Sequence, residues 1–182
     1  MEIRKAKIEE IDSIMEIYKR ARRFMAQTGN PNQWGDSKPY REWIENDIES
    51  GKCYICVERV DNKKIIDEIS EANSVREKEI IAAVFYFAIE EDSTYKVIYE
   101  GEWLNYEPYG VVHRIASAGN IKGAGEFCLK WALNACGNLR IDTHKDNKVM
   151  QNLLKKLDFQ YCGIIHLKDG APRLAFQIEK YS

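Results

Sequence analysis

Hydrophobic side chains recur with helical spacing in four segments of the chain. Residues 9–26 show this most clearly, because apolar side chains repeat every three or four positions from Ile11 to Met25 and form one stripe. Gly29 follows as a terminator of that helix. The other segments predicted to be helical are residues 40–50, 123–136 and 147–157.

Shorter apolar runs have the length and composition of β-strands. The runs expected to be strands are residues 52–60, 80–90, 95–105, 110–117 and 138–143, followed by a closing hairpin of 159–167 and 172–181. This pattern predicts an α/β (α+β) fold with one mixed central sheet of about six to seven strands and helices on both faces. We expect one domain spanning residues 1–182.

Residues 61–78 interrupt the pattern between two predicted strands. The stretch is rich in charged residues and lacks aromatic side chains. We expect an extended, mobile insertion loop.

Composition and charge narrow the range of functions. The formal net charge of −2 argues against a nucleic-acid-binding protein driven by general positive charge. No apolar run reaches the roughly 18 residues that cross a bilayer, so no membrane partner is expected. The first residues, MEIRKAKIEEID, contain no apolar signal core, and we expect a cytoplasmic location.

The five cysteines do not form a regular framework of spacings. Cys53 and Cys56 form a C-x-x-C pair, but they lie in a predicted strand, where residues three apart point to opposite faces. The two thiols are therefore expected to be core residues, and no metal site is predicted. An odd number of cysteines in apolar surroundings suits a reducing compartment.

Glycines are concentrated just before the helix predicted at 123–136. Glycine lets a ligand approach the main chain closely, and a helix start offers unpaired N–H groups with partial positive charge. Together these features predict a phosphate-binding site. Two common phosphate motifs do not fit: Gly125 is followed by Glu126 rather than Lys-Ser/Thr, and the third glycine of the dinucleotide fingerprint is missing. A plain strand-to-helix turn is the alternative.

The segment Asn120-Ile121-Lys122-Gly123-Ala124-Gly125 resembles the acyl-CoA signature of the GNAT superfamily of N-acetyltransferases, (Gln/Arg)-x-x-Gly-x-(Gly/Ala). Both signature glycines match, whereas Asn120 departs from the first position. Ile115-Ala116-Ser117 stands where the family has a Leu-Ala-Val-like triplet. Asn147 opens the later helix, and Asp158-Phe159 stands where Gly-Phe is usual. The likeness covers nearly the whole chain and looks like a bacterial branch of the family.

The resemblance implies a mostly antiparallel sheet in which two parallel strands splay apart around acetyl-CoA (coenzyme A). It places the pantetheine arm along the strand, the diphosphate on the glycine loop, and Asn147 on the other side of the arm. The cofactor-binding residues implied in this way are Ile115, Ala116, Ser117, Asn120, Ile121, Lys122, Gly123, Ala124, Gly125 and Asn147. For Asn147, a helix cap is the alternative role.

His113 is the candidate general base for removing a proton from the attacking amine. An imidazole titrates near neutral pH, and His113 precedes Ile115 by two residues, so both are expected on one face of the strand. The alternative is a structural histidine. Many family members carry a tyrosine as general acid where this chain has Leu154, so Tyr161 or Tyr109 is a substitute candidate, or the thiolate leaves without one.

For the acceptor, the resemblance implies Trp34, Glu102, Tyr106 and Tyr109 as substrate-binding residues. Aromatic rings with carboxylates suit a cationic amine, so a small molecule, amino acid or peptide is expected to be the acceptor. The same residues could equally form a homodimer contact. The predicted function is acetyl-CoA-dependent N-acetyl transfer, and the alternative is a non-catalytic acyl-CoA-binding or regulatory module with the same fold.

Overall fold

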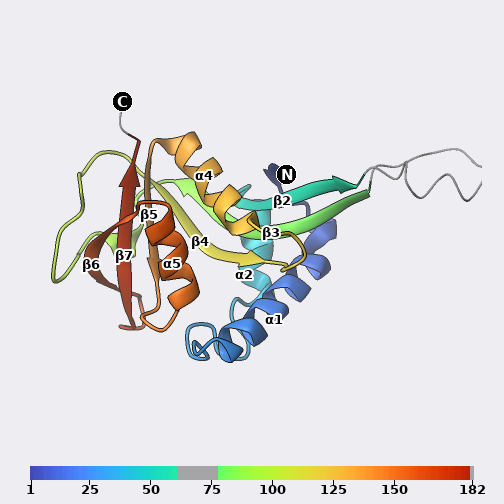
Figure 1. Ribbon diagram of the computed structural model, residues 1–182, viewed down its shortest axis with the longest axis horizontal. Coiled ribbons are helices and arrows are strands. Elements are labelled where there is room, and N and C mark those ends of the chain that lie inside the picture. The colour runs from blue at the N-terminus through green and yellow to red at the C-terminus, as the bar shows by residue number, and fades with distance from the viewer. Residues whose placement is uncertain (61–77, 181–182) are drawn as a thin grey trace, which may run out of the picture.

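The computed structural model describes residues 1–60 and 78–180 of the chain. Seven strands form one sheet in the order β1-β2-β3-β4-β5-β7-β6, and four α-helices cover it in the described part (Figure 1). The strands are β1 (Glu2–Lys5), β2 (Cys53–Val60), β3 (Lys78–Ile89), β4 (Gly110–Ser117), β5 (Asn138–Thr143), β6 (Gln160–His166) and β7 (Pro172–Glu179). The helices are α1 (Ile11–Gln27), α2 (Arg41–Glu49), α4 (Ala124–Cys136) and α5 (Lys148–Lys156), with short 3-10 turns η1 (Ile8–Glu10) and η2 (Ser93–Tyr95).

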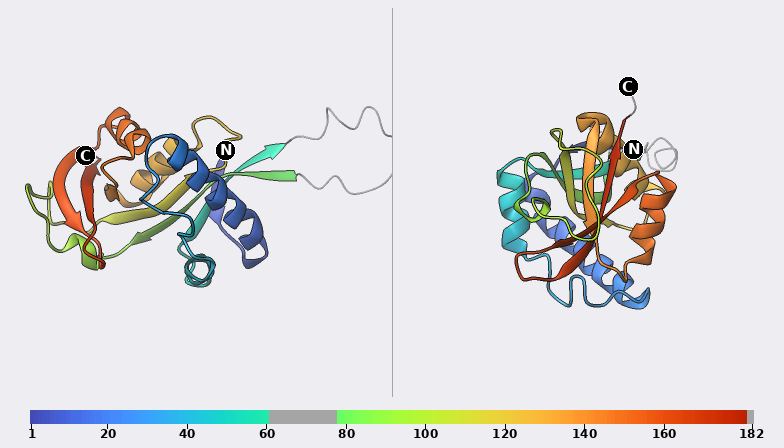
Figure 2. Two further views of the ribbon diagram at one scale, coloured as in Figure 1. Left: turned by 90° about the horizontal axis from the view of Figure 1, so that it is seen from below. Right: turned by 90° about the vertical axis from the view of Figure 1, so that its left-hand side faces the viewer.

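The sheet is mixed and mostly antiparallel. Among the strands of residues 1–60 and 78–180, β4 and β5 form the one parallel pair, and the other neighbouring strands pair antiparallel. α1 and α2 lie on one face and α4 and α5 on the other (Figure 2). The predicted fold class and the four predicted helices are confirmed, with helix ends shifted by at most two residues.

Each face of the sheet has its own core, and the two cysteines of the C-x-x-C pair show this. Cys53 packs with α1 and α2, whereas Cys56 packs with α4 on the opposite face. Both side chains are buried. The prediction that a strand separates these two thiols is therefore confirmed.

The prediction of a strand at residues 95–105 is wrong. The chain forms η2 and then a loop, and it makes a single bridge to the sheet, between Tyr99 and Ile164. The apolar pattern arises because Tyr95 and Trp103 are buried as anchors in a third core cluster. Gly101 lets this loop approach β6 closely, because a Cβ at that position would lie 2.1 Å from the carbonyl oxygen of Cys162.

The predicted insertion at 61–78 lies outside the described residues, except for Lys78, which begins β3. Among the helices that the structure describes, none has the length and apolar character needed to span a membrane.

Candidate active site

The two parallel strands at the centre of the sheet separate after a short contact. β4 and β5 pair at Gly110↔Leu139 and Val111↔Arg140, and their later residues are not paired with each other. A cavity of about 1150 Å³ opens along the diverging strands, and α1 and the starts of α4 and α5 contribute to its walls. The splayed parallel strands implied by the resemblance are thus confirmed.

A β-bulge in β4 shapes the cavity wall. Between the pairs Tyr86↔His113 and Val84↔Ala116, β4 contains one residue more than β3, and Arg114 has a φ of 51°. Such a bulge bends a strand and re-aims its side chains.

The bulge corrects one expectation about β4. Ile115 packs on the α4 side of the sheet, whereas Arg114 binds Asp47 of α2 and lies over the ring of Tyr86, which also faces His113. His113 and Ile115 were expected to share a face, and this is wrong because the extra residue breaks the alternation of the strand.

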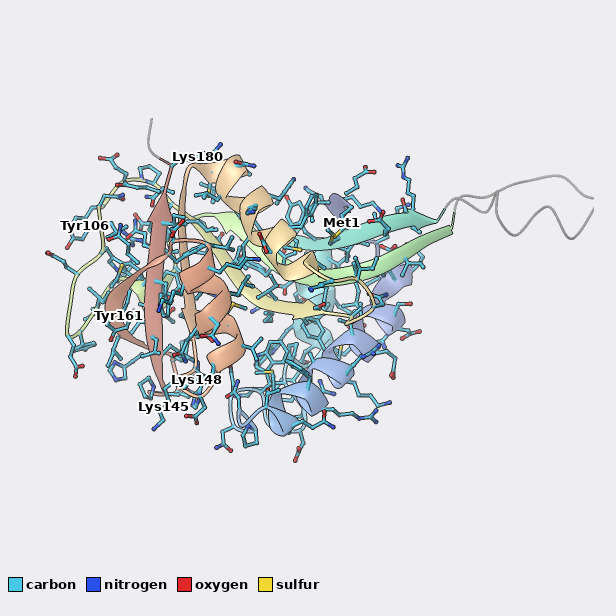
Figure 3. All side chains as sticks on the ribbon, in the orientation of Figure 1. Met1, Tyr106, Lys145, Lys148, Tyr161 and Lys180 are labelled. Carbon is cyan, nitrogen blue, oxygen red and sulfur yellow. The ribbon has the colours of Figure 1, made fainter. Side chains whose placement is uncertain are left out.

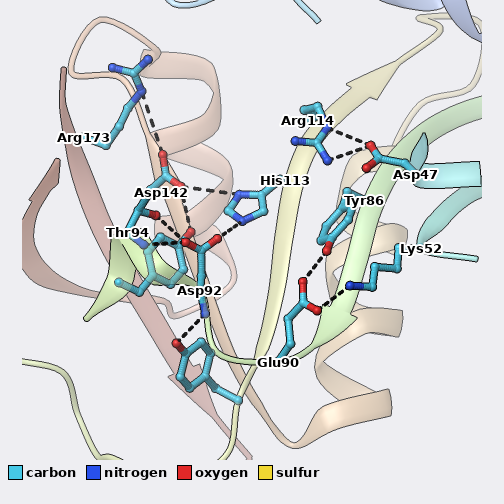
Figure 4. Close-up of polar contacts among 12 residues, drawn as sticks. Asp47, Lys52, Tyr86, Glu90, Asp92, Thr94, His113, Arg114, Asp142 and Arg173 are labelled. Carbon is cyan, nitrogen blue, oxygen red and sulfur yellow. Dashed lines mark hydrogen bonds and ion pairs between the residues drawn. The ribbon is translucent and has the colours of Figure 1, made fainter. Parts of the chain in front are cut away.

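His113 lies between two carboxylates in the cavity wall (Figure 4). Its Nε2 is 2.8 Å from Oδ2 of Asp92, and its Nδ1 is 3.7 Å from Oδ1 of Asp142. Asp92 follows β3 and Asp142 belongs to β5, so residues distant in sequence meet where β4 and β5 separate. We call His113, Asp92, Thr94, Tyr95 and Asp142 the His113 cluster.

Hydrogen bonds keep Asp92 ionised. Burial would raise the pKa of the Asp92 carboxyl, but hydrogen bonds from His113 and from Thr94 outweigh burial and hold its pKa well below the usual range. The main-chain N–H and the hydroxyl of Thr94 donate to Oδ1 over 2.7 and 2.6 Å. An ionised carboxylate can only accept, so Nε2 of His113 must carry the proton in this contact. Neutral His113 therefore presents the lone pair of Nδ1.

Asp142 is held in place by a buried tyrosine. The hydroxyl of Tyr95 donates to Oδ1 of Asp142 over 2.7 Å, and Nε of Arg173 lies 4.0 Å from Oδ2. The distance between Nδ1 of His113 and Asp142 is too long for a hydrogen bond. Within the described residues, Nδ1 of His113 thus has no hydrogen-bond partner and can accept a proton.

The glycine loop supplies main-chain donors at the start of α4. Gly123 has a φ of 84° and stands at the N-cap without a side-chain capping bond. In the described residues, the N–H groups of 121–126 have no hydrogen-bond acceptor, and the first loop-to-helix bond comes from Phe127. Unpaired N–H groups at the positive end of a helix dipole form a receptor for an anion.

Half of the predicted cofactor residues lie in the cavity wall. These are Ile115, Ala116, Ser117, Gly125 and Asn147. Residues 120–124 belong to the same loop but do not line the cavity, and Asn120 donates instead to the carbonyl oxygen of Ile81 over 3.1 Å. Asn147 caps α5 by accepting from the N–H of Met150, which confirms the alternative role, and it also lines the cavity.

Most of the predicted acceptor and acid residues lie elsewhere. Trp34 lines the cavity, whereas Glu102, Tyr106 and Tyr109 do not. Tyr106 is 83% exposed, and Tyr109 stacks on Arg140. Tyr161 is 53% exposed on β6, and Figure 3 shows it on the same side of the molecule as Tyr106. Its position argues against Tyr161 as a general acid.

Sequence reasoning missed several side chains that line the cavity. They comprise an aromatic and apolar wall from α1 and α2, and a set of carboxylates near the His113 cluster. The residues are Phe24, Met25, Trp43, Glu90, Glu91, Asp92 and Asp142. One signal was available for Asp142: it is a carboxylate near the C-terminal end of the strand 138–143, which borders the predicted parallel gap.

Comparison with known proteins decides the family. No protein-family model and no curated protein sequence matches the chain. A solved GNAT-family acetyltransferase from Streptococcus agalactiae is 32% identical, with a TM-score of 0.79 over 100% of this chain and 96% of that one. The chain belongs to the GNAT family of acetyltransferases.

Two further acetyltransferase structures share the fold at lower identity. A putative acetyltransferase from Staphylococcus aureus is 18% identical, with a TM-score of 0.64 over 98% of this chain and 99% of that one. A putative acetyltransferase from Salmonella typhimurium, solved with its cofactor acetyl-CoA, is 13% identical, with a TM-score of 0.55 over 98% and 92%.

At position 154, where the resemblance implies a tyrosine as proton donor, this GNAT chain has a leucine. Leu154 is fully buried in the core between α5 and the sheet, and it does not line the cavity. The neighbouring cavity residues of α5, Met150 and Leu153, are also apolar. In the described part, α5 therefore offers no acidic hydrogen to the cavity.

Proposed function

We propose that this protein is an acetyl-CoA-dependent N-acetyltransferase that moves an acetyl group to a primary amine by direct attack on the thioester. One observation carries the proposal. A single cavity between splayed strands combines a receptor for an anion, at the start of α4, with a histidine held by an ionised carboxylate. The acetyl-CoA bound by the similar Salmonella protein supports the choice of donor.

The residues present fit a thioester cofactor with a long polar arm. Unpaired N–H groups of residues 121–125 would hold the diphosphate, and exposed Lys122 would add charge. After Val111 the β5-facing edge of β4 has no partner strand, so main-chain groups near Ile115 and Ser117 would bond the pantetheine arm as an added strand. The bound cofactor supplies an activated acetyl group as a thioester.

His113 acts on the amine. Asp92 keeps the proton on Nε2, and Nδ1 accepts a proton from the ammonium form of the acceptor, which frees the nitrogen lone pair to attack the thioester carbonyl. The nitrogen releases its second proton to solvent as the amide forms. The new C–N bond forms as the C–S bond breaks, and the sulfur leaves as a thiolate. Because Leu154 cannot donate a proton, the thiolate leaves unaided or takes a proton from water. Main-chain polarisation and positioning of the carbonyl then carry more of the catalysis.

The cavity wall suits a cationic acceptor. Carboxylates at Glu90, Glu91 and Asp142 face the same cavity as the indoles of Trp34 and Trp43. Carboxylates attract an ammonium group by charge, and aromatic faces attract it by cation–π interaction. We infer that the acceptor is the primary amine of a small molecule, an amino acid or a peptide.

A thiol-release assay tests this function. The protein is incubated with acetyl-CoA and a panel of amines, and free coenzyme A thiol is measured. We expect release that depends on one class of amine, and a loss of about 100- to 10,000-fold in kcat for His113→Ala. His144→Ala is the control, because His144 does not line the cavity.

The same assay separates the enzyme from a binding module. Leu154 favours the module, because the expected proton donor is missing. Tight binding of acetyl-CoA without thiol release for any amine would identify a non-catalytic acyl-CoA-binding protein. Equal rates for His113→Ala and the wild type would remove His113 from the mechanism.

A further inference from the structure

The glycine loop departs from the acyl-CoA signature at its first position. The signature has glutamine or arginine there, and this chain has Asn120. The amide of Asn120 donates to the carbonyl oxygen of Ile81, and the side chain does not line the cavity. Lys122 is exposed and is likewise absent from the cavity wall. The loop residues that do line the cavity, Gly119 and Gly125, carry no side chain, so the loop itself places no cation on the cavity wall.

A cation from another element stands beside this loop. The guanidinium of Arg20, on α1, lies against Gly119: a Cβ at Gly119 would be 3.6 Å from both Cζ and Nε of Arg20. Arg20 and Gly119 both line the cavity, as does Gly125 at the start of α4. Figure 1 shows α1 passing close to the loop between β4 and α4.

The positive charge of Arg20 is not neutralised by its surroundings. Arg20 makes no hydrogen bond or ion pair to any residue that the structure describes. Glu16, one helical turn earlier, accepts from Lys19 over 3.1 Å. An arginine with five unused donors at the rim of an anion receptor is suited to bidentate binding of phosphate.

We propose that Arg20 binds the diphosphate of coenzyme A from α1 and supplies the charge that position 120 of the loop lacks. This inference rests on the proposed function, because it assumes that the loop holds the cofactor. The diphosphate lies between the main-chain donors of the loop and the guanidinium of Arg20. α1 thereby has two roles: it contributes Phe24 and Met25 to the aromatic and apolar wall of the cavity, and it binds the donor through Arg20.

Calorimetric titration of three ligands tests Arg20. Coenzyme A carries a diphosphate and a 3′-phosphate, dephospho-coenzyme A keeps the diphosphate alone, and pantetheine has neither. We expect Arg20→Ala to weaken both nucleotide ligands by about tenfold or more, with Arg20→Lys intermediate, and to leave pantetheine unchanged. The affinity of Arg20→Ala for coenzyme A should also depend less on salt concentration than that of the wild type.

Arg23→Ala is the matched control. Arg23 is an exposed arginine of the same helix, but it does not line the cavity. Its loss should change the affinity for coenzyme A less than twofold, whereas a loss equal to that of Arg20→Ala would assign the effect to the general charge of α1 and overturn the role of Arg20.

The possible results separate this inference from the proposed function. A wild-type protein that binds no coenzyme A would overturn both. Normal wild-type binding with equal affinity for Arg20→Ala would overturn the role of Arg20 alone. A loss seen with coenzyme A but not with dephospho-coenzyme A would assign Arg20 to the 3′-phosphate and overturn the diphosphate contact. An equal loss with pantetheine would show that Arg20 acts on the shape of the groove.

Discussion

The glycine loop, through Gly119 and Gly125 at its ends, and the His113 cluster border one cavity but are built in different ways. The loop uses the main chain of consecutive residues, and its N–H groups are available because Gly123, the N-cap of α4, has no side chain to cap them. The His113 cluster uses side chains from β3's end, β4 and β5, which meet only in the folded protein. One site depends on local conformation, and the other depends on tertiary structure.

This difference decides how each site should respond to mutation. A main-chain site has few side chains to remove, so it is damaged by filling the space that a ligand needs. A side-chain cluster is damaged by changing one donor or acceptor, because its hydrogen bonds no longer determine which atoms of the remaining groups carry protons. The predictions below separate the two sites in this way, from the largest expected effect to the smallest.

Gly123→Trp should abolish binding of coenzyme A while the fold is kept. A Cβ at Gly123 meets no atom within 4 Å, so the indole can project over the loop and block the diphosphate. The φ of 84° adds strain of about 1–2 kcal/mol. Titration calorimetry measures the binding, and circular dichroism follows the fold.

Gly170→Trp is the control for that strain. Gly170 has a φ of 81°, and its Cβ would also meet nothing within 4 Å, but it lies in the turn between β6 and β7. The two variants should lose similar thermal stability, whereas only Gly170→Trp should bind coenzyme A normally. Normal binding by Gly123→Trp would show that the loop does not hold the diphosphate.

Asp92→Asn should lower kcat by on the order of 100-fold and leave binding of coenzyme A unchanged. The asparagine can still accept from Thr94, but its NH₂ group would face Nε2 of His113. Nε2 would then accept a hydrogen bond, and the proton would move to Nδ1, the nitrogen needed as the base. Steady-state kinetics with the amine found in the thiol-release assay measures the effect.

A matched control for Asp92→Asn is Asp146→Asn, because Asp146 is a partly exposed acid outside the cavity wall. It should retain nearly full activity. A loss of coenzyme A affinity in Asp92→Asn comparable to its loss of kcat would contradict the separation of the two sites.

Asp92 should also contribute to stability in a pH-dependent way. Its folded pKa is depressed by His113 and Thr94 against the opposing effect of burial. Between the folded and unfolded pKa values the unfolded state binds more protons, so raising the pH stabilises the fold. The contribution is fully present above the unfolded value of about 3.9 and is lost as the pH falls through the folded pKa.

Thermal melts of the wild type and Asp92→Asn between neutral and strongly acidic pH measure this contribution. The wild type should be more stable near neutral pH, and the difference in Tm should shrink below about pH 4. A difference that stays constant to the lowest pH would mean that the carboxylate is not stabilised by its hydrogen bonds.

The contrast between local and tertiary structure also explains what the sequence could predict. The helical stripes and the paired glycines are local, so the fold class and the position of the loop could be inferred, whereas the splayed strands were implied by the family resemblance alone. The bulge at Arg114 and the meeting of Asp92, His113 and Asp142 depend on how β3, β4 and β5 pair. The segment around Tyr95 and Trp103 was predicted as a strand because these buried side chains give an apolar pattern, and burial alone produces such a pattern without strand pairing.

Asp158→Gly should stabilise the protein by about 0.5–1 kcal/mol without changing either site. The sequence departs here from the family's Gly-Phe, but the main chain keeps a left-handed conformation with a φ of 62°. Glycine adopts this conformation without a Cβ penalty, and a carboxylate directly after α5 faces the negative end of the helix dipole.

Asp158→Ala separates these two causes, because it removes the charge and keeps the Cβ. Urea unfolding should show the gain for Asp158→Gly and a smaller gain or none for Asp158→Ala. If alanine stabilised as much as glycine, the charge at the end of α5 would be the cause, and the left-handed backbone would cost nothing measurable. If the left-handed backbone is the cause of the stability difference, the family's glycine at this position is explained by the conformation of the main chain, as the glycines of the loop are.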